Sequence, residues 1–198
     1  MNIVLASGSP RRRDLLEKLG WSVHVVVPEI DERPLTSESP GNLCVRLSAA
    51  KAAKVAETRL YNGDVPIVAA DTIVVVDGDV LGKPADESES LLMLRRLQGR
   101  AHEVLTGVSV IGKGKSLIGL ERTIVNFRAL DESAVRAYAA SGEGMDKAGA
   151  YAIQGKGSLL VASIEGDYFN VVGLPLCRLG LMMEEMGLNL PLQWGAKT

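Results

Sequence analysis

The order of apolar and polar residues along the chain predicts alternating strands and helices. The run NIVLA at 2–6 predicts a buried strand. Ser9 and Pro10 then suit the first positions of a helix, because a serine can cap a helix and a proline needs no backbone donor there. Gly20 is a fitting end for that helix. The chain is therefore expected to begin with a strand, a tight turn and a helix.

The same reasoning predicts the remaining elements. We expect further helices at 40–60, 86–98, 131–140 and 175–187, and strands at 22–27, 66–76, 79–84 and 158–164. Residues 101–128 predict two long strands around a turn at 112–115, and Asp77-Gly78 predicts a primed hairpin turn. The Gly-rich stretch at 142–157 is expected to be a loop, and the tail after Gly187 to be loose.

Together these elements predict an α/β fold with a mixed sheet that contains antiparallel hairpins. The adjacent strands without a helix between them disfavour a purely parallel sheet, because parallel strands need a crossover connection. The sequence shows no internal repeat, no low-complexity segment and no linker. We therefore expect a single domain over residues 1–198.

Composition restricts the function classes. The 198 residues are 46% hydrophobic, which is enough for a substantial core. With 22 basic and 24 acidic residues the net charge is −2, so neither nucleic acid nor an anionic membrane is an expected partner. The start lacks the features of a signal peptide, and no uncharged apolar run reaches about 18 residues. We expect a cytoplasmic protein.

We do not expect the cysteines or histidines to bind a metal or to take part in catalysis. Cys44 and Cys177 stand far apart without a metal-binding spacing, so both are expected to be reduced core thiols. His24 and His102 lie within or beside strand-like runs, where a structural role is the commoner one. Any acid or base catalysis therefore falls to carboxylates and lysines.

Three arginines crowd the start of the first predicted helix. A helix N-terminus already carries partial positive charge, so Arg11, Arg12 and Arg13 should each destabilise it slightly. Rules of this kind are most often broken at functional sites. Together with Gly8 and the hydroxyls of Ser7 and Ser9, which precede them, these guanidinium groups suit a bound polyphosphate. A solvated basic turn is the alternative.

Asp71 interrupts an otherwise apolar strand. Asp is depleted in strands and costs several kcal/mol to bury unpaired, so this residue needs a partner or a function. A strand kink that exposes an ordinary Asp is the alternative. Glu32 in the acidic loop 28–34, Thr72 and Lys83 are the further candidates. Two carboxylates, a lysine and Mg²⁺ or Mn²⁺ would form a set able to cleave phosphate bonds.

Seven ordered blocks carry a family resemblance over nearly the whole chain. They are LASGSPRRRDLLEKLG at 5–20, RLSAAKA at 46–52, AADTIV at 69–74, LGKP at 81–84, GRAHEVLTGV at 99–108, DKAGAYAIQG at 146–155 and YFNVVGLPL at 168–176. In this order they resemble the Maf family of nucleoside triphosphate pyrophosphatases, which are structurally similar to inosine triphosphate pyrophosphatases.

The resemblance implies hydrolysis between the α- and β-phosphates of a nucleoside triphosphate, with a divalent cation (Mg²⁺ or Mn²⁺) as cofactor. It implies an α/β body with a long mixed sheet and flanking helices that form two lobes around a deep cleft, in a homodimer. Asp71 matches the family's proton acceptor, Glu32 and Lys83 match other catalytic positions, and Glu32 and Asp71 are the expected metal ligands. The residues expected to bind phosphate or line the cleft are Ser7, Ser9, Arg11, Arg12 and Lys51.

Three positions resemble the branch that acts on dTTP and UTP. These are Arg11, Thr72 and Gln154, where the branch that acts on 7-methyl-GTP typically carries Trp, Gln and Glu. The Gln154 amide offers one donor and one acceptor, which fits uracil or thymine. The loop around it is expected to receive the base, with Tyr151 as a stacking or packing surface.

Other functions stay open at this point. The Gly-rich start is also similar to that of sugar nucleotidyltransferases, although Ser9-Pro10 departs from their pattern. A 7-methyl-GTP pyrophosphatase is a second alternative. A nucleotide-binding regulator of cell division, without essential catalysis, is a third, because the Maf family is also associated with inhibition of septum formation.

Overall fold

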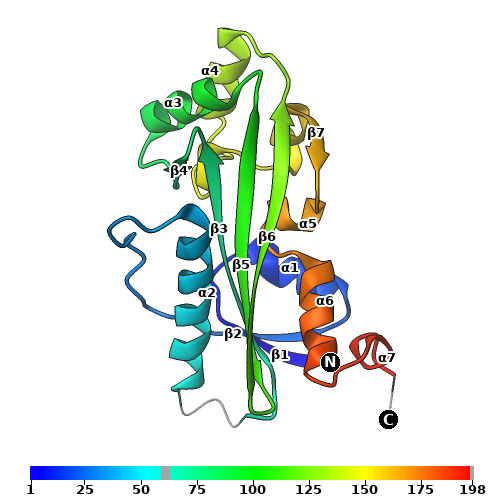
Figure 1. The fold of residues 1–198 in the computed structure, drawn as a ribbon. Coiled ribbons are helices and arrows are strands. Elements are labelled where there is room, and N and C mark those ends of the chain that lie inside the picture. Colours follow the sequence, from blue (N-terminus) through cyan, green and yellow to red (C-terminus); the bar gives the residue numbers. More distant parts are fainter. Residues whose placement is uncertain (59–62, 197–198) are drawn as a thin grey trace. The chain divides into compact units, whose positions relative to one another are not determined.

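The structure is a computed structural model that describes residues 1–58 and 63–196. Over these residues it is a mixed α/β fold with a seven-stranded sheet, in the order β2-β1-β3-β5-β6-β7 with β4 paired to β3 (Figure 1). β1 runs parallel to β2 and to β3, whereas β4 is antiparallel to β3 and β7 is antiparallel to β6. The predicted mixed sheet with flanking helices is confirmed.

The strands and helices have the following bounds. The strands are β1 (Asn2–Leu5), β2 (Ser22–Val25), β3 (Ile67–Val76), β4 (Asp79–Leu81), β5 (Ala101–Gly112), β6 (Lys115–Phe127) and β7 (Val161–Glu165). The helices are α1 (Pro10–Lys18), α2 (Pro40–Ala56), α3 (Glu87–Leu97), α4 (Glu132–Ala140), α5 (Tyr168–Val172), α6 (Leu176–Glu185) and α7 (Leu190–Gln193), with short 3-10 helices η1 (Ala148–Ala150) and η2 (Gly155–Leu159).

The chain divides into two compact units, each built from separate stretches of sequence. Unit 1 contains Met1–Asp71, Thr106–Glu121 and Gly173–Thr198. Unit 2 contains Thr72–Leu105 and Arg122–Val172. The strands β3, β5 and β6 each contribute residues to both units.

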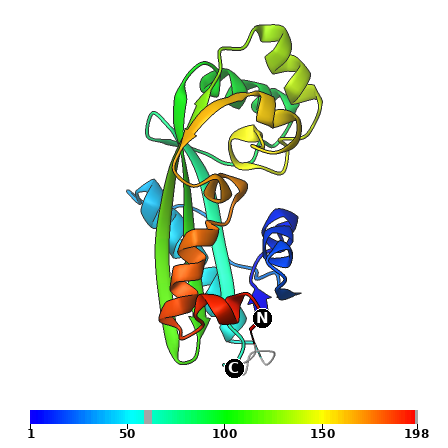
Figure 2. The same cartoon turned by 90° about the vertical axis from the view of Figure 1, so that its right-hand side faces the viewer.

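In unit 1, the short strand β1 lies between β2 and the start of β3, with Leu5 opposite Val68. Ile3, Leu5 and Ile67 are almost completely buried there. The N-terminus lies beside α7 in both views of the cartoon (Figures 1 and 2). At that end of the unit, the indole of Trp21 donates a hydrogen bond of 2.9 Å to the carbonyl of Gln193. The residues after Gly187, expected to be loose, therefore form a short helix that packs on the start of β2.

The helix α2 lies very close to β5 in unit 1. A Cβ atom at Gly107 would stand 2.3 Å from the carbonyl oxygen of Cys44, so only a glycine allows this approach. Next to it, the buried hydroxyls of Ser48 and Ser109 are 3.0 Å apart and share a hydrogen bond. These two contacts fix the depth at which α2 sits on the sheet.

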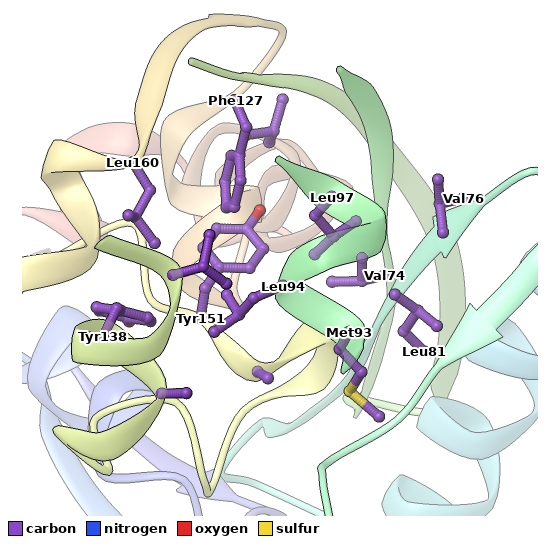
Figure 3. Packing of buried hydrophobic residues seen from close by; sticks show 14 of the residues in the cluster. Val74, Val76, Leu81, Met93, Leu94, Leu97, Phe127, Tyr138, Tyr151 and Leu160 are labelled. Carbon is purple, nitrogen blue, oxygen red and sulfur yellow. The ribbon is translucent and has the colours of Figure 1, made fainter. Parts of the chain in front are cut away.

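Unit 2 has its own apolar core, to which α3 contributes Met93, Leu94 and Leu97 (Figure 3). Phe127 and Tyr151 meet edge to face in this core, with ring centroids 4.7 Å apart. Tyr151 is therefore a packing surface in the core of unit 2. The other predicted role, a surface on which the nucleobase of a substrate stacks, does not fit the burial of the Tyr151 side chain.

Several element boundaries differ from those predicted. α2 ends at Ala56, before the predicted end at residue 60, which lies outside the described residues. The strand predicted at 158–164 begins only at Val161, because the residues before it belong to η2 and its end. The five-residue helix α5 was not predicted. The primed turn is confirmed, since Asp77 and Gly78 both have positive φ angles of 55° and 84°.

The cysteine prediction is half right. Cys44 and Cys177 are both free, and Cys44 is buried as expected. Cys177 is exposed at the start of α6, so the prediction of a core thiol is wrong there. Within 1–58 and 63–196, no helix combines the length and the apolar character needed to cross a membrane.

Candidate active site

Unit 1 brings together three of the predicted site residues, Glu32, Lys51 and Asp71. The Nζ atom of Lys51 lies 2.6 Å from Oδ1 of Asp71 and 2.7 Å from Oε1 of Glu32. The side chains of Lys51 and Asp71 are only 12% and 11% exposed, whereas that of Glu32 is 60% exposed. One ammonium group therefore joins a buried and an open carboxylate.

Asp71 is buried within a continuous strand. β3 runs without interruption from Ile67 to Val76, and all its residues except Thr72 are buried. The alternative that a kink exposes an ordinary Asp is therefore wrong. The partner that a buried carboxylate requires is Lys51, which α2 presents to this strand.

Arg12 is the arginine of the basic turn that points into the unit. Its Nε donates a hydrogen bond of 2.8 Å to the carbonyl of Gly173, and its Nη1 donates one of 3.0 Å to Oγ of Ser7. Burial lowers the pKa of Arg12, while attraction by the charge of Asp71 acts in the opposite direction. The charge of Glu32 acts on Arg12 in the same direction, so Arg12, which holds Ser7, lies within electrostatic reach of the two carboxylates.

The other residues of the basic turn differ from Arg12. Arg13 is exposed and stands 3.8 Å from both Asp14 and Glu17, which are weak surface pairs. Ser9 occupies the N-cap position of α1, but its side chain makes no capping hydrogen bond. The predicted N-cap position of Ser9 is therefore confirmed, but its hydroxyl makes no capping bond that a ligand would have to break. Arg11 is half-buried.

A clamp that sequence reasoning missed holds the loop that carries Glu32. The Arg46 guanidinium donates to both carboxylate oxygens of Glu38, at 2.6 and 2.8 Å, and to the carbonyl of Arg33 at 3.0 Å. The same Glu38 accepts the N–H of Leu35 at 3.0 Å. Hydrogen bonding to Arg46 lowers the pKa of Glu38 to about 2. The sequence offered only Arg46 itself, in the block RLSAAKA, and nothing in the pattern paired it with Glu38.

The remaining predicted residues, Thr72, Lys83 and Gln154, belong to unit 2. Thr72 and Gln154 are half-buried, and Lys83 is exposed just after β4. The segment of Lys83 is held against the DKAGAYAIQG loop, because the N–H of Gly149 donates a hydrogen bond of 3.0 Å to the carbonyl of Gly82. Two of the seven sequence blocks are thus neighbours within this unit.

The donor set of unit 1 fits a hard divalent cation that shares its coordination with a substrate. Mg²⁺ is usually bound by one or two carboxylates together with substrate phosphates, rather than by a cage of protein ligands. Glu32 and Asp71 supply two carboxylates that already converge on one cation, the Lys51 ammonium. In the described part of the chain, no cluster of three or more His, Cys, Asp and Glu side chains is placed to hold a metal.

Comparison with known proteins gives the same result as the ordered sequence blocks. Residues 2–186 match the Maf family, described as "Maf-like protein". A dTTP/UTP pyrophosphatase of Symbiobacterium thermophilum is 49% identical over 185 residues, which cover 93% of this chain and 94% of that protein. A dTTP/UTP pyrophosphatase of Bacillus thuringiensis subsp. konkukian is 45% identical over 188 residues, covering 95% and 97% of the two chains.

Among solved structures, the Staphylococcus aureus Ham1 protein is similar with a TM-score of 0.44 and 15% identity, over 64% of this chain and 72% of that one. The family match extends over almost the full length, and the relatives are well above 30% identical across more than nine-tenths of both chains. This chain therefore belongs to the Maf family.

Proposed function

We propose that this protein hydrolyses nucleoside triphosphates, with dTTP and UTP as substrates, to the monophosphate and pyrophosphate. The observation that carries the proposal is the arrangement in unit 1, where a buried Asp71 shares a lysine with Glu32. The names of the relatives, which are nearly half identical over almost the whole chain, support the same substrates.

In this proposal, Asp71 accepts the proton of the attacking water. A carboxylate can act as a general base when it is within reach of the water, and Asp71 is held in one place by Lys51. Arg12 and Ser7 provide donors to the phosphate oxygens, because a guanidinium and a hydroxyl both suit a polyphosphate. Glu32 and Asp71 would hold a divalent cation, which would neutralise phosphate charge when bound.

Base selection is assigned to unit 2 residues and to Arg11. Gln154 provides one donor and one acceptor, matching the N3–H and O4 groups of uracil and thymine. Thr72 directly follows Asp71, the proposed general base, in the sequence, and it is the first residue of unit 2. We assign all three residues to substrate binding on this basis.

A pyrophosphate-release assay over canonical and modified nucleotides tests the proposal. We expect UTP and dTTP to be the best substrates, each giving one monophosphate and one pyrophosphate per turnover, with activity lost in EDTA and restored by Mg²⁺ or Mn²⁺. Preference for 7-methyl-GTP would contradict the base assignment. Pyrophosphate release from UTP only when a sugar phosphate is added would indicate a nucleotidyltransferase instead. Binding of nucleotides without any turnover would favour a regulatory role.

A further inference from the structure

In unit 2, the loop that carries Gln154 is held at one end by the carboxylate of Glu143 and at the other end by Tyr138, which is hydrogen-bonded to Glu143. Glu143 accepts the N–H of Lys156 on Oε1 at 2.9 Å and the N–H of Gly157 on Oε2 at 2.8 Å. At the other end of the loop, Tyr138 Oη accepts the N–H of Ala152 at 3.1 Å, and Tyr138 is itself hydrogen-bonded to Glu143. Gln154 lies between these two anchor points.

Two glycines of the loop lie so close to Glu143 or to its partner Tyr138 that a side chain would not fit. Gly155 has a φ of +64°, and a Cβ atom there would stand 2.3 Å from Oε1 of Glu143. A Cβ atom at Gly157 would stand 2.0 Å from the carbonyl oxygen of Ala152 and 2.7 Å from Tyr138 Oη. Neither Gly155 nor Gly157 therefore has space for a side chain.

The electrostatics of Glu143 agree with this geometry. Burial would raise the pKa of its carboxyl, but the N–H groups of Lys156 and Gly157, together with the Tyr138 hydroxyl and the charge of Lys147, lower it overall. The ionised form accepts both N–H groups at once, whereas a neutral acid or an amide would turn a donor toward one of them. The loop is therefore held by the charged carboxylate.

We propose that Glu143 is the positioning residue for Gln154, and that it sets the discrimination between bases in the reaction. This inference rests on the proposed function, because it needs Gln154 to read the base. The backbone on both sides of Gln154 is held through one carboxylate, so the position of its amide depends on Glu143.

Loosening this loop should change the selection of the base more than the chemical step. Contacts to the base are remote from the phosphorus that reacts, and they contribute binding energy to correct substrates. A loop that samples several positions binds UTP less tightly and distinguishes it less well from a purine nucleotide. The expected signature is a raised KM for UTP and a smaller ratio of kcat/KM between UTP and GTP.

Glu143→Gln is the first test, since it keeps the size of the side chain and removes the charge. We expect the UTP:GTP ratio of kcat/KM to fall at least about fivefold, mainly through the KM for UTP. We also expect faster amide hydrogen exchange in the peptide 152–158. Glu132→Gln is the matched control in the same unit, because Glu132 lies on α4 and pairs with Arg95 and Arg136. It should leave both the ratio and the exchange of 152–158 unchanged.

A glycine pair gives an independent test. Gly155→Ala forces a methyl group against the Glu143 carboxylate. Gly142→Ala is the control: Gly142 has a similar φ of +70°, but an added Cβ atom there would meet no atom of the described residues within 4 Å. Both substitutions strain the backbone alike, so only the first should reduce the UTP:GTP ratio. In a Glu143→Ala background, Gly155→Ala should change the UTP:GTP ratio less than it does alone, because the carboxylate that the new methyl group would meet is absent.

The outcomes separate this inference from the function on which it rests. If wild-type protein releases pyrophosphate from UTP but Glu143→Gln keeps the wild-type UTP:GTP ratio, Glu143 does not set base discrimination and the inference is overturned, whatever the exchange shows. If wild-type protein releases pyrophosphate from no nucleotide, the proposed function fails, and base discrimination through Glu143 fails with it. The exchange of 152–158 then decides only whether Glu143 holds the loop.

Discussion

Lys51 and Asp71 meet between α2 and β3, with Nζ of the lysine 2.6 Å from Oδ1 of the aspartate. Each side chain is about nine-tenths buried, so neither charge is well solvated by water. Burying a charged pair is costly, and removing one partner usually costs more than the pair itself contributes. A pair of this kind in the middle of an apolar strand is therefore better explained by function than by stability.

Replacing Asp71, the proposed general base, should abolish most of the activity without unfolding the protein. Asp71→Asn keeps the shape of the side chain and a possible acceptor for Lys51, but it cannot take a proton from water. We expect kcat for pyrophosphate release from UTP to fall by about 10²–10⁴-fold, the usual contribution of a general base. Steady-state kinetics with Mg²⁺ or Mn²⁺ in excess would measure this loss.

Asp79→Asn is a suitable control for that experiment. Asp79 lies at the start of β4 and pairs only on the surface with Arg96, 2.9 Å away. Its replacement should leave kcat close to the wild-type value. Turnover by Asp71→Asn within a few-fold of wild type, in a protein with an unchanged circular dichroism spectrum, would remove Asp71 from the mechanism.

The Arg46 clamp should matter for activity through Glu32. Arg46→Met removes the hydrogen bonds to Glu38 and to the Arg33 carbonyl, which is next to Glu32 in the chain. A loop displaced by about 1 Å can cost up to about 100-fold in rate, so we expect a drop of that order in kcat/KM. If the clamp acts through Glu32, Arg46→Met should add little to a Glu32→Gln variant. Additive losses in the double variant would instead point to a separate role for Arg46.

Local signals account for most of the correctly predicted elements. Pro10 and Gly20 delimit α1, and Asp77-Gly78 marks the β3–β4 turn, because each residue type restricts the backbone at its own position. Asp71 could be selected for a similar reason, since a carboxylate in an apolar strand is unusual whatever surrounds it. Each of these signals can be recognised from the residue and its neighbours in the sequence, without knowledge of distant contacts.

The errors occur where distant contacts decide the structure. Leu159 and Leu160 resemble the start of a strand, yet Leu159 is 71% exposed and belongs to η2, in which Gly157 is hydrogen-bonded to Glu143. The pairing of Arg46 with Glu38 depends on the path of an irregular loop, which no periodicity describes. Sequence alone indicated the charged residues of the site, but not the clamp that places Glu32.

Gly107 should prove essential for stability, because α2 approaches β5 at that position. An alanine methyl group would stand 2.3 Å from the Cys44 carbonyl oxygen and 2.8 Å from the backbone nitrogen of Val45, and backbone atoms cannot rotate away. We expect Gly107→Ala to lower the free energy of unfolding by about 1–3 kcal/mol or more. Urea denaturation would measure the change.

Gly82→Ala is the matched control for this stability measurement. Gly82 has no described atom within 4 Å of an added Cβ atom and does not need a positive φ, so its replacement should be almost neutral. Equal effects of the two substitutions would show that α2 and β5 tolerate a wider separation. A selective loss at Gly107 should be accompanied by lower activity, since α2 carries Lys51.

His102 should make the stability of the protein depend on pH. It is 3% exposed, its Nε2 lies 2.8 Å from Tyr151 Oη, and its Nδ1 has no hydrogen-bond partner among the residues that the structure describes. Burial lowers its pKa from the ordinary value of 6.5 to about 4. As the pH falls below about 6.5, the unfolded chain therefore takes up a proton that the folded protein resists, and the free energy of unfolding decreases until about pH 4. The full difference amounts to roughly 3 kcal/mol.

His102→Gln isolates this effect, because an amide can still hydrogen-bond to Tyr151 but does not titrate. Between about pH 7 and pH 4.5, wild-type protein should lose roughly 2 kcal/mol more of its free energy of unfolding than the variant does. His24 is exposed and is the same in both proteins, so it does not affect the difference between them. Equal losses in the two proteins would contradict the prediction. They would mean that His102 has the same proton affinity in the folded and unfolded states, despite its burial against Phe127 and Tyr151.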